Sequence, residues 1–190
     1  MYTIPFAVDA PLTDAQFEGL CKSNPDVSYE LTAKGELVVN PPTRGWGSIR
    51  ESRLLMSLTS WAQADGRGYV TSSTGLYLLP NGAKRAPDAG WVLKSKFDAL
   101  PDDAQDGFIP LVPDFVAELR SPSDPLKPLQ AKMTEYMDVG VRLGWLIDPQ
   151  NRSVTVYRQD GSTEQLTNPV SVDGGDVLAG FKLTLADIWD

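Results

Sequence analysis

Two acidic residues of this chain stand within or at the head of apolar segments that are typical of buried strands. Glu118 interrupts the apolar run of residues 115–117, and Asp88 heads a segment that continues through residues 89–93. Burial of a lone carboxylate costs several kcal/mol, so each acid needs a cation, a metal ion or a functional role. With Lys132 on the helix expected to follow, the two carboxylates suit a metal-dependent hydrolytic site. In such a site a metal ion activates water, and a cation faces the scissile phosphate.

The scarcity of histidine and cysteine in the chain excludes several kinds of catalytic and metal site. The sequence contains no histidine and one cysteine, Cys21. These counts exclude a Ser-His-Asp triad, a histidine general base, imidazole or cysteine-clustered zinc sites and an internal disulfide. A bound metal ion would have oxygen ligands, which favours Mg²⁺ or Mn²⁺ over zinc or copper.

A simpler interpretation of the same residues stays open. Pro-Asp dipeptides recur along the chain, so Pro87-Asp88 is not distinctive by itself. Glu118 and Arg120 lie two residues apart, on one face of a strand, where they can form an ordinary salt bridge. In this alternative Glu118, Arg120 and Lys132 form a buried ion network that holds no metal ion.

Strand-like and helical patterns alternate around these residues. Strands are expected at residues 27–32, 36–40, 69–71, 75–79, 85–93, 113–121, 141–147, 153–158 and 163–166. Helices are expected from Thr13 or Asp14, over 48–64 and 94–100, and after Asp124, with an acidic loop at 101–107. The fold class is therefore α/β or α+β, with a central mixed sheet flanked by helices. Residues 1–190 are expected to form a single domain, because no repeat or interdomain linker interrupts them.

The helix after Asp124 carries one apolar stripe, with Lys132 at its edge. The stripe consists of Leu126, Leu129, Met133, Tyr136 and Met137. At about 100° per residue, Lys132 lies about 40° from Tyr136 and can lean over the sheet, while Glu135 is expected to face water. Asp124 is expected to cap this helix, whose first turn tolerates proline.

The net charge of the chain and its distribution along the sequence indicate whether the protein can bind nucleic acid. The net charge of −8 argues against a protein that coats nucleic acid, yet residues 44–96 hold eight basic residues against three acidic ones. Either a basic face on an acidic body or a scattered, solvated set of charges explains this segment. The chain has no run of roughly 18 apolar residues and no export signal, so a cytoplasmic protein without a membrane partner is expected.

Three stretches together resemble the Uma-type (Uma-two) restriction endonuclease family, a branch of the PD-(D/E)XK nuclease superfamily. They are residues 29–42 (YELTAKGELVVNPP), residues 85–92 (RAPDAGWV), and residues 113–124 (PDFVAELRSPSD) running through 132–136 (KMTEY) to 144–149 (GWLIDP). The similarity covers nearly the whole chain in the right order. It implies a restriction-endonuclease-like core.

The resemblance also implies roles for individual residues. The metal-binding, catalytic acids of the family map to Asp88 and Glu118. The simple superfamily pattern has a lysine two residues after the glutamate, where this chain has Arg120. Arginine is a poor substitute for lysine because its guanidinium stays protonated and presents its N–H donors in a fixed, forked geometry. The resemblance therefore assigns the basic catalytic role to Lys132 and leaves Arg120 as an accessory that contacts phosphate or pairs with Glu118.

A further acid on the first strands or the first long helix often completes such sites. The candidates are Glu30, Glu36 and Glu51, and Glu36 is favoured as the accessory residue.

The leading hypothesis is a Mg²⁺- or Mn²⁺-dependent endonuclease that hydrolyses phosphodiester bonds of nucleic acid, with DNA as the expected substrate. One alternative is a catalytically inactive binding or structural module on the same fold. Another is a phosphate-ester hydrolase that acts on small substrates. A homodimer is expected only by analogy with superfamily members that cut two strands.

Overall fold

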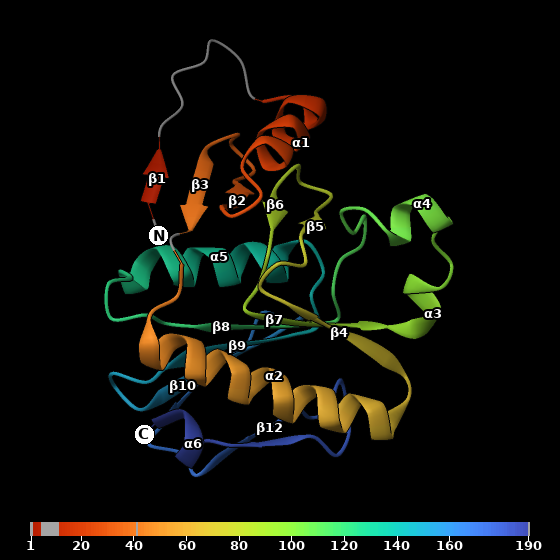
Figure 1. Cartoon of the computed structure of the whole chain (residues 1–190). Coiled ribbons are helices and arrows are strands. Elements are labelled where there is room, and N and C mark those ends of the chain that lie inside the picture. Colours follow the sequence, from red (N-terminus) through yellow and green to blue (C-terminus); the bar gives the residue numbers. More distant parts are fainter. Residues whose placement is uncertain (1, 5–11, 41, 190) are drawn as a thin grey trace.

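The computed structural model of the protein describes residues 2–4, 12–40 and 42–189 (Figure 1). Its centre is a six-stranded sheet with the order β11-β10-β9-β8-β7-β4. Strands β8 and β9 are parallel and the other neighbours are antiparallel, so the sheet is mixed, as predicted. The strands are β4 (Gly68–Ser72), β7 (Ala89–Leu93), β8 (Phe115–Leu119), β9 (Leu143–Asp148), β10 (Ser153–Arg158) and β11 (Thr163–Thr167).

A second sheet, which the sequence patterns did not separate from the first, has the order β1-β3-β2-β6-β5. Its strands are short: β1 (Tyr2–Ile4), β2 (Ser28–Leu31), β3 (Leu37–Asn40), β5 (Tyr77–Leu78) and β6 (Lys84–Arg85). Helix α1 (Asp14–Ser23), capped by Thr13 as predicted, buries Phe17 against Leu31 and Leu37 of this sheet. Figure 1 shows this unit above α5, on the side of the large sheet away from α2.

The strand predicted over residues 85–93 is wrong in one respect, because it is two strands. Its first part, β6, pairs with β2 and β5 in the small sheet, and its second part, β7, pairs with β4 and β8 in the large sheet. The break contains Pro87, which has no backbone N–H to donate to a sheet ladder. As a result Asp88 stands where the chain crosses from one sheet to the other.

Helix α2 (Gly45–Asp65) covers one face of the large sheet (Figure 1). Leu54, Leu58 and Ala62 recur every four residues and pack on an aromatic layer that includes Trp91 and Trp145. The helix starts three residues earlier than predicted and ends at Gly66, whose φ of 73° is left-handed. The C-terminal segment closes this side with β12 (Ser171–Asp173), β13 (Lys182–Thr184) and α6 (Ala186–Trp189).

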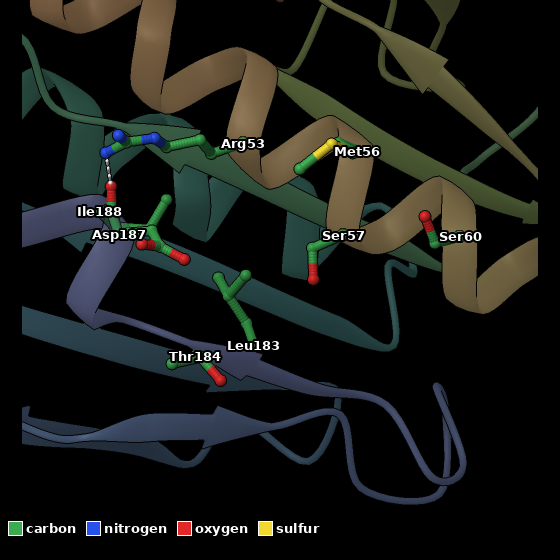
Figure 2. A pocket seen from close by; sticks show the side chains of 8 residues that line it. All are labelled: Arg53, Met56, Ser57, Ser60, Leu183, Thr184, Asp187 and Ile188. Atoms are coloured by element: carbon green, nitrogen blue, oxygen red, sulfur yellow. Dashed lines mark hydrogen bonds between the residues drawn. The ribbon is translucent and has the colours of Figure 1, made fainter.

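Helix α6 is held against α2 by arginine side chains. Arg50 Nε donates to the carbonyl of Ile188 at 2.7 Å, and Arg53 donates to the carbonyl of Asp187. Figure 2 shows the shallow hollow beside this contact, which Met56 borders from α2. Two arginines of the segment rich in basic residues therefore hold the closing helix in place.

Helix α5 (Leu126–Asp138) covers the opposite face and lies between the two sheets (Figure 1). Its predicted stripe is confirmed, since Leu129, Met133 and Tyr136 are buried against Val116 and Leu146. The expected cap is wrong, because Pro125 occupies the N-cap position and Asp124 Oδ2 accepts instead from the N–H of Ser121.

Two short helices follow β7. They are α3 (Lys94–Phe97) and α4 (Asp102–Gln105), so the expected acidic loop contains one helical turn. Within the residues that the structure describes, no helix is both long and apolar enough to cross a membrane.

Substitution of Gly68 in β4 tests how tightly side chains pack on the face of the large sheet that α2 covers. A Cβ at Gly68 would overlap the buried indole of Trp91, whereas a Cβ at Gly144 would meet the flexible ends of Met133 and Met137. We expect Gly68→Ala to lower the free energy of unfolding by about 1–3 kcal/mol, and Gly144→Ala to lower it by less. Urea denaturation of the two variants measures this. Equal losses of unfolding free energy would show that the packing around Trp91 accommodates an added methyl group as readily as Met133 and Met137 do.

Candidate active site

A chain of ion pairs crosses from the large sheet through α5 to the small sheet. Lys132 Nζ of α5 lies 2.8 Å from Glu118 Oε1 of β8 and 2.8 Å from Glu30 Oε1 of β2. Arg85 of β6 continues the chain, with 3.1 Å to Glu30 Oε2 and 2.6 Å to Glu135 Oε2. Acids and bases therefore alternate along five side chains from four elements.

The centre of this chain is out of contact with water. The exposed fractions are 0% for Glu30, 4% for Glu118, 5% for Lys132 and 6% for Arg85. Removing such charges from water costs several kcal/mol for each ion, which only close pairing and further hydrogen bonds offset. Asn40 and the N–H of Ala86 supply two such bonds to Glu30 Oε1, both at 3.4 Å.

The pairing fixes the protonation of the three central groups. Burial opposes ionisation of Glu30, but Lys132 and Arg85 outweigh it, and the pKa of Glu30 is lowered. Burial also opposes the charge on Lys132, yet Glu118 and Glu30 raise the pKa of its ammonium. The pKa of Glu118 is raised by burial, against the pull of Lys132 and with a further contribution from Glu30. Lys132 is therefore a fixed cation at neutral pH and is not a general base.

Tyr136 orients one oxygen of Glu118. Its hydroxyl donates to Glu118 Oε1 at 3.2 Å, and burial, followed by the charge of Glu118, raises the pKa of the phenol well above its ordinary value. The phenol consequently keeps its proton. Because Lys132 and Tyr136 both bind Oε1, this side of the Glu118 carboxylate is fully engaged by α5.

Asp88 stands next to Glu118 without a cation of its own. Its Oδ2 accepts the N–H of Leu119 at 2.7 Å, and no salt bridge joins it to a cation among the described residues. Burial raises the pKa of Asp88 well above its ordinary value, and the charges of Glu118 and Glu51 raise it further. Ionisation of Asp88 is thus disfavoured in the metal-free protein, because neither Lys132 nor Arg85 forms a salt bridge with it.

The acids nearest Lys132 line a cavity of about 770 Å³, which we call the acid cavity. Asp88, Glu118, Lys132, Glu30 and Glu51 all border it. Its lining also includes Asn40, Arg44, Trp46, Arg50, Ser73, Thr74, Arg120, Ser121 and Ser123. The predicted residues Asp88, Glu118 and Lys132 are therefore brought together, although they come from the β6–β7 crossing, β8 and α5.

The accessory acid favoured from the sequence, Glu36, lies elsewhere. It is exposed at the β2–β3 hairpin, where its Oε2 accepts from the hydroxyl of Thr32 at 3.2 Å, and it does not border the acid cavity. The other two candidates, Glu30 and Glu51, do border it. Glu51 accepts a hydrogen bond from Ser73 Oγ and thereby joins α2 to the cavity wall.

The sequence contained a signal for Glu51. It lies three residues before Leu54 and seven before Leu58, on the same helical face that α2 turns to the sheet. A carboxylate on a buried helical face needs a partner or a function. No comparable signal separates Glu30 from Glu36, because the sequence does not show which face of the hairpin meets α5.

Arg120 does not pair with Glu118, so that interpretation is wrong. Its NH1 lies 2.7 Å from Asp148 Oδ2, and its Nε donates to the carbonyl of Asp124 at 3.0 Å. Glu135 does not face water as expected, because it pairs with Arg85. Arg85 itself was missed, since its partners lie far away in the sequence.

The basic segment does not form a free basic face. Arg67 pairs with Asp65, Lys84 with Asp14, and Lys96 with Asp114. With Arg85 in the ion chain, and Arg50 and Arg53 bound to α6, most of these charges are committed within the fold.

The donors present suit a hard divalent cation. Asp88 and Glu118 offer carboxylate oxygens, which Mg²⁺ and Mn²⁺ prefer. No group of three or more acidic or cysteine side chains with the proximity of a complete metal site occurs in the described part of the chain. Two carboxylates would leave the remaining coordination positions to water and phosphate, as is usual for Mg²⁺. Asp88 and Glu118 are the residues that would hold such an ion.

The raised pKa of Asp88 predicts a stability penalty in the metal-free protein. Above its ordinary value of 3.8, the unfolded chain releases this proton while the folded chain retains it. Stability therefore falls as the pH rises towards the folded-state pKa. We expect Asp88→Asn, which can still accept from Leu119, to stabilise the metal-free protein at pH 8 by about 0.5–2 kcal/mol and to flatten this pH dependence.

Urea denaturation in chelator across the pH range measures the effect. Asp138→Asn, at an exposed position of α5, is the control and should leave the slope unchanged. A less stable Asp88→Asn variant at pH 8 would contradict the electrostatic account.

Comparison with known proteins agrees with this architecture. The model of a family described as "Uma2: Putative restriction endonuclease" matches residues 14–186. A crystal structure described as "a putative nuclease belonging to DUF820" from Anabaena variabilis superposes with a TM-score of 0.79 and 22% sequence identity, over 94% of this chain and 98% of that one. A comparison with curated proteins finds no match. The family match spans nearly the whole chain, and the protein belongs to the Uma2 family.

Proposed function

We propose that this protein is a Mg²⁺- or Mn²⁺-dependent endonuclease that hydrolyses phosphodiester bonds of DNA. The observation that carries the proposal is that Asp88 and Glu118 border one cavity together with Lys132. The Nζ of Lys132 lies 2.8 Å from Glu118 Oε1. Membership of a family of nucleases supports the reaction class. The donor set supports the metal.

Five side chains in and around the acid cavity have a defined task in this proposal. Asp88 and Glu118 would hold the ion, which would supply an acidified water and neutralise charge on the phosphate. Lys132, a permanent cation, would stabilise the negative charge that develops on phosphate oxygens. Glu30 and Tyr136 are positioning residues, because they contact Lys132 and Glu118 and so fix the orientation of these two side chains.

A specific feature favours a rival function as well. The pairs among Glu118, Lys132, Glu30 and Arg85 satisfy one another, as they would in an inactive binding or structural module. This rival does not explain the uncompensated charge at Asp88. Calorimetric titration of Mn²⁺, alone and with a DNA oligonucleotide, separates the two, because only the nuclease loses Mn²⁺ binding in both Asp88→Ala and Glu118→Ala.

Replacement of Lys132 tests the catalytic proposal directly. We expect Lys132→Met to lower kcat for DNA cleavage by about 10²–10³-fold, because a preorganised cation at the developing charge is removed. Calorimetric titration of Mn²⁺ into Lys132→Met separates this catalytic loss from a loss of the metal ligand Glu118, which Lys132 contacts. Lys127→Met is the matched control, since Lys127 lies on the same helix but is exposed and does not border the cavity. Cleavage that survives both Lys132→Met and Asp88→Ala would refute this site.

A further inference from the structure

One aromatic side chain is exposed at the acid cavity. Trp46, in the first turn of α2, has 55% of its surface exposed, whereas the other four tryptophans are buried or half-buried. Isolated exposed apolar side chains are common, so position and not exposure carries the argument. Trp46 borders the same cavity as Asp88 and Glu118. An indole is therefore available to whatever molecule enters that cavity.

More than half of the Trp46 side chain is open to solvent. Its neighbour Gly45 has a φ of +32°, and a Cβ built there would meet no heavy atom within 4 Å. The guanidinium carbon of Arg50 lies over the indole ring, 5.8 Å from its centroid, and the Arg50 side chain is itself fixed to the carbonyl of Ile188. A flat ligand would therefore approach the face of the indole that Arg50 does not cover.

Two arginines and two serines besides Arg50 border the same cavity as Trp46, from the start of α2 and from the segment after β8. Arg44, two residues before Trp46, is exposed, and its side chain makes no salt bridge or hydrogen bond within the described part of the chain. Arg120, Ser121 and Ser123 border the cavity from the segment after β8. Arginine and serine side chains are common partners of nucleic-acid phosphates.

We propose that Trp46 is a nucleobase-stacking site, and that the substrate is single-stranded where it is cut. Aromatic side chains stack on any base, because every base has a π-face. In a duplex those faces are covered by neighbouring bases, so a base reaches Trp46 only when it is unstacked. A cavity of about 770 Å³ lies in the range of pockets that bind drug-sized ligands, which suits an unstacked nucleotide. The inference rests on the proposed function for the chemical class of the ligand.

The test compares binding of labelled oligothymidylate with binding of a labelled hairpin duplex by fluorescence anisotropy. All proteins carry Asp88→Asn, which prevents hydrolysis under the proposed function and removes one negative charge from the cavity. We expect Trp46→Ala to weaken binding of the single strand by about 5- to 150-fold and binding of the duplex by less than about twofold. Trp46→Phe should keep most of the affinity.

Met56→Ala is the matched control. Met56 is an apolar side chain on the same helix, 67% exposed, but it borders the hollow beside α6 and not the acid cavity (Figure 2). Arg44→Ala should weaken the binding of both ligands alike. It should also lower the slope of log affinity against log salt concentration by about one, as expected for the loss of one phosphate contact. Failure of the parent to bind the single strand, equal losses for both ligands in Trp46→Ala, or an equal loss in Met56→Ala would each overturn the inference.

The result is separable from the proposed nuclease activity. If Trp46→Ala loses single-strand binding while the wild-type protein cleaves nothing with either metal, the base-stacking site stands and the nuclease proposal fails. If the wild-type protein cleaves in a manner that depends on Asp88, but Trp46→Ala binds the single strand normally, the nuclease stands and the stacking site fails.

Discussion

The ammonium of Lys132 joins the two sheets of this protein. It pairs with Glu118 of the large sheet and with Glu30 of the small sheet, both at 2.8 Å. The described strands of the small sheet contain two to four residues each, and sheets of such short strands depend on packing for their stability. Because Lys132 also holds the carboxylate proposed to bind metal, docking of the small sheet and geometry of the site depend on the same contact.

The charges around Lys132 are arranged unevenly, and this asymmetry favours the proposed metal site over an inert network. Glu30 is flanked by two cations, which lower its pKa, whereas Asp88, among the described residues, has a backbone N–H as its one hydrogen-bond partner and an elevated pKa. A network selected only for stability would gain nothing from an uncompensated carboxylate beside Glu118. A divalent cation would remove that disadvantage, and perturbed carboxylates of this kind concentrate at functional sites.

Sequence periodicity predicted most of the elements that build the large sheet and its helices, but not all of the contacts between them. The face of α5 and the buried run of β8 follow from local spacing, so Lys132 and Glu118 were found. The separation of β6 from β7 was not predicted, although Pro87 marks the place where the hydrogen-bond ladder of the sheet must stop. Arg85 and Glu135 were missed because their pairing depends on docking of the small sheet on α5. The strand-like segments pointed to both Asp88 and Glu118, and resemblance to a family added the expectation that they bind metal together, which spacing alone left open.

The acidic body of the protein limits how it can hold a polyanion. A net charge of −8 repels nucleic acid at long range, and the basic residues of the 44–96 segment are mostly paired within the fold. Association cannot then rely on a broad phosphate-binding surface, whose affinity would fall steeply with salt. Under the proposed function, affinity would come from a few short-range contacts at the acid cavity: the metal ligands Asp88 and Glu118, the exposed Arg44 and the proposed stacking on Trp46. Stacking depends little on charge, so it would suit a protein that binds nucleic acid against its own electrostatic field.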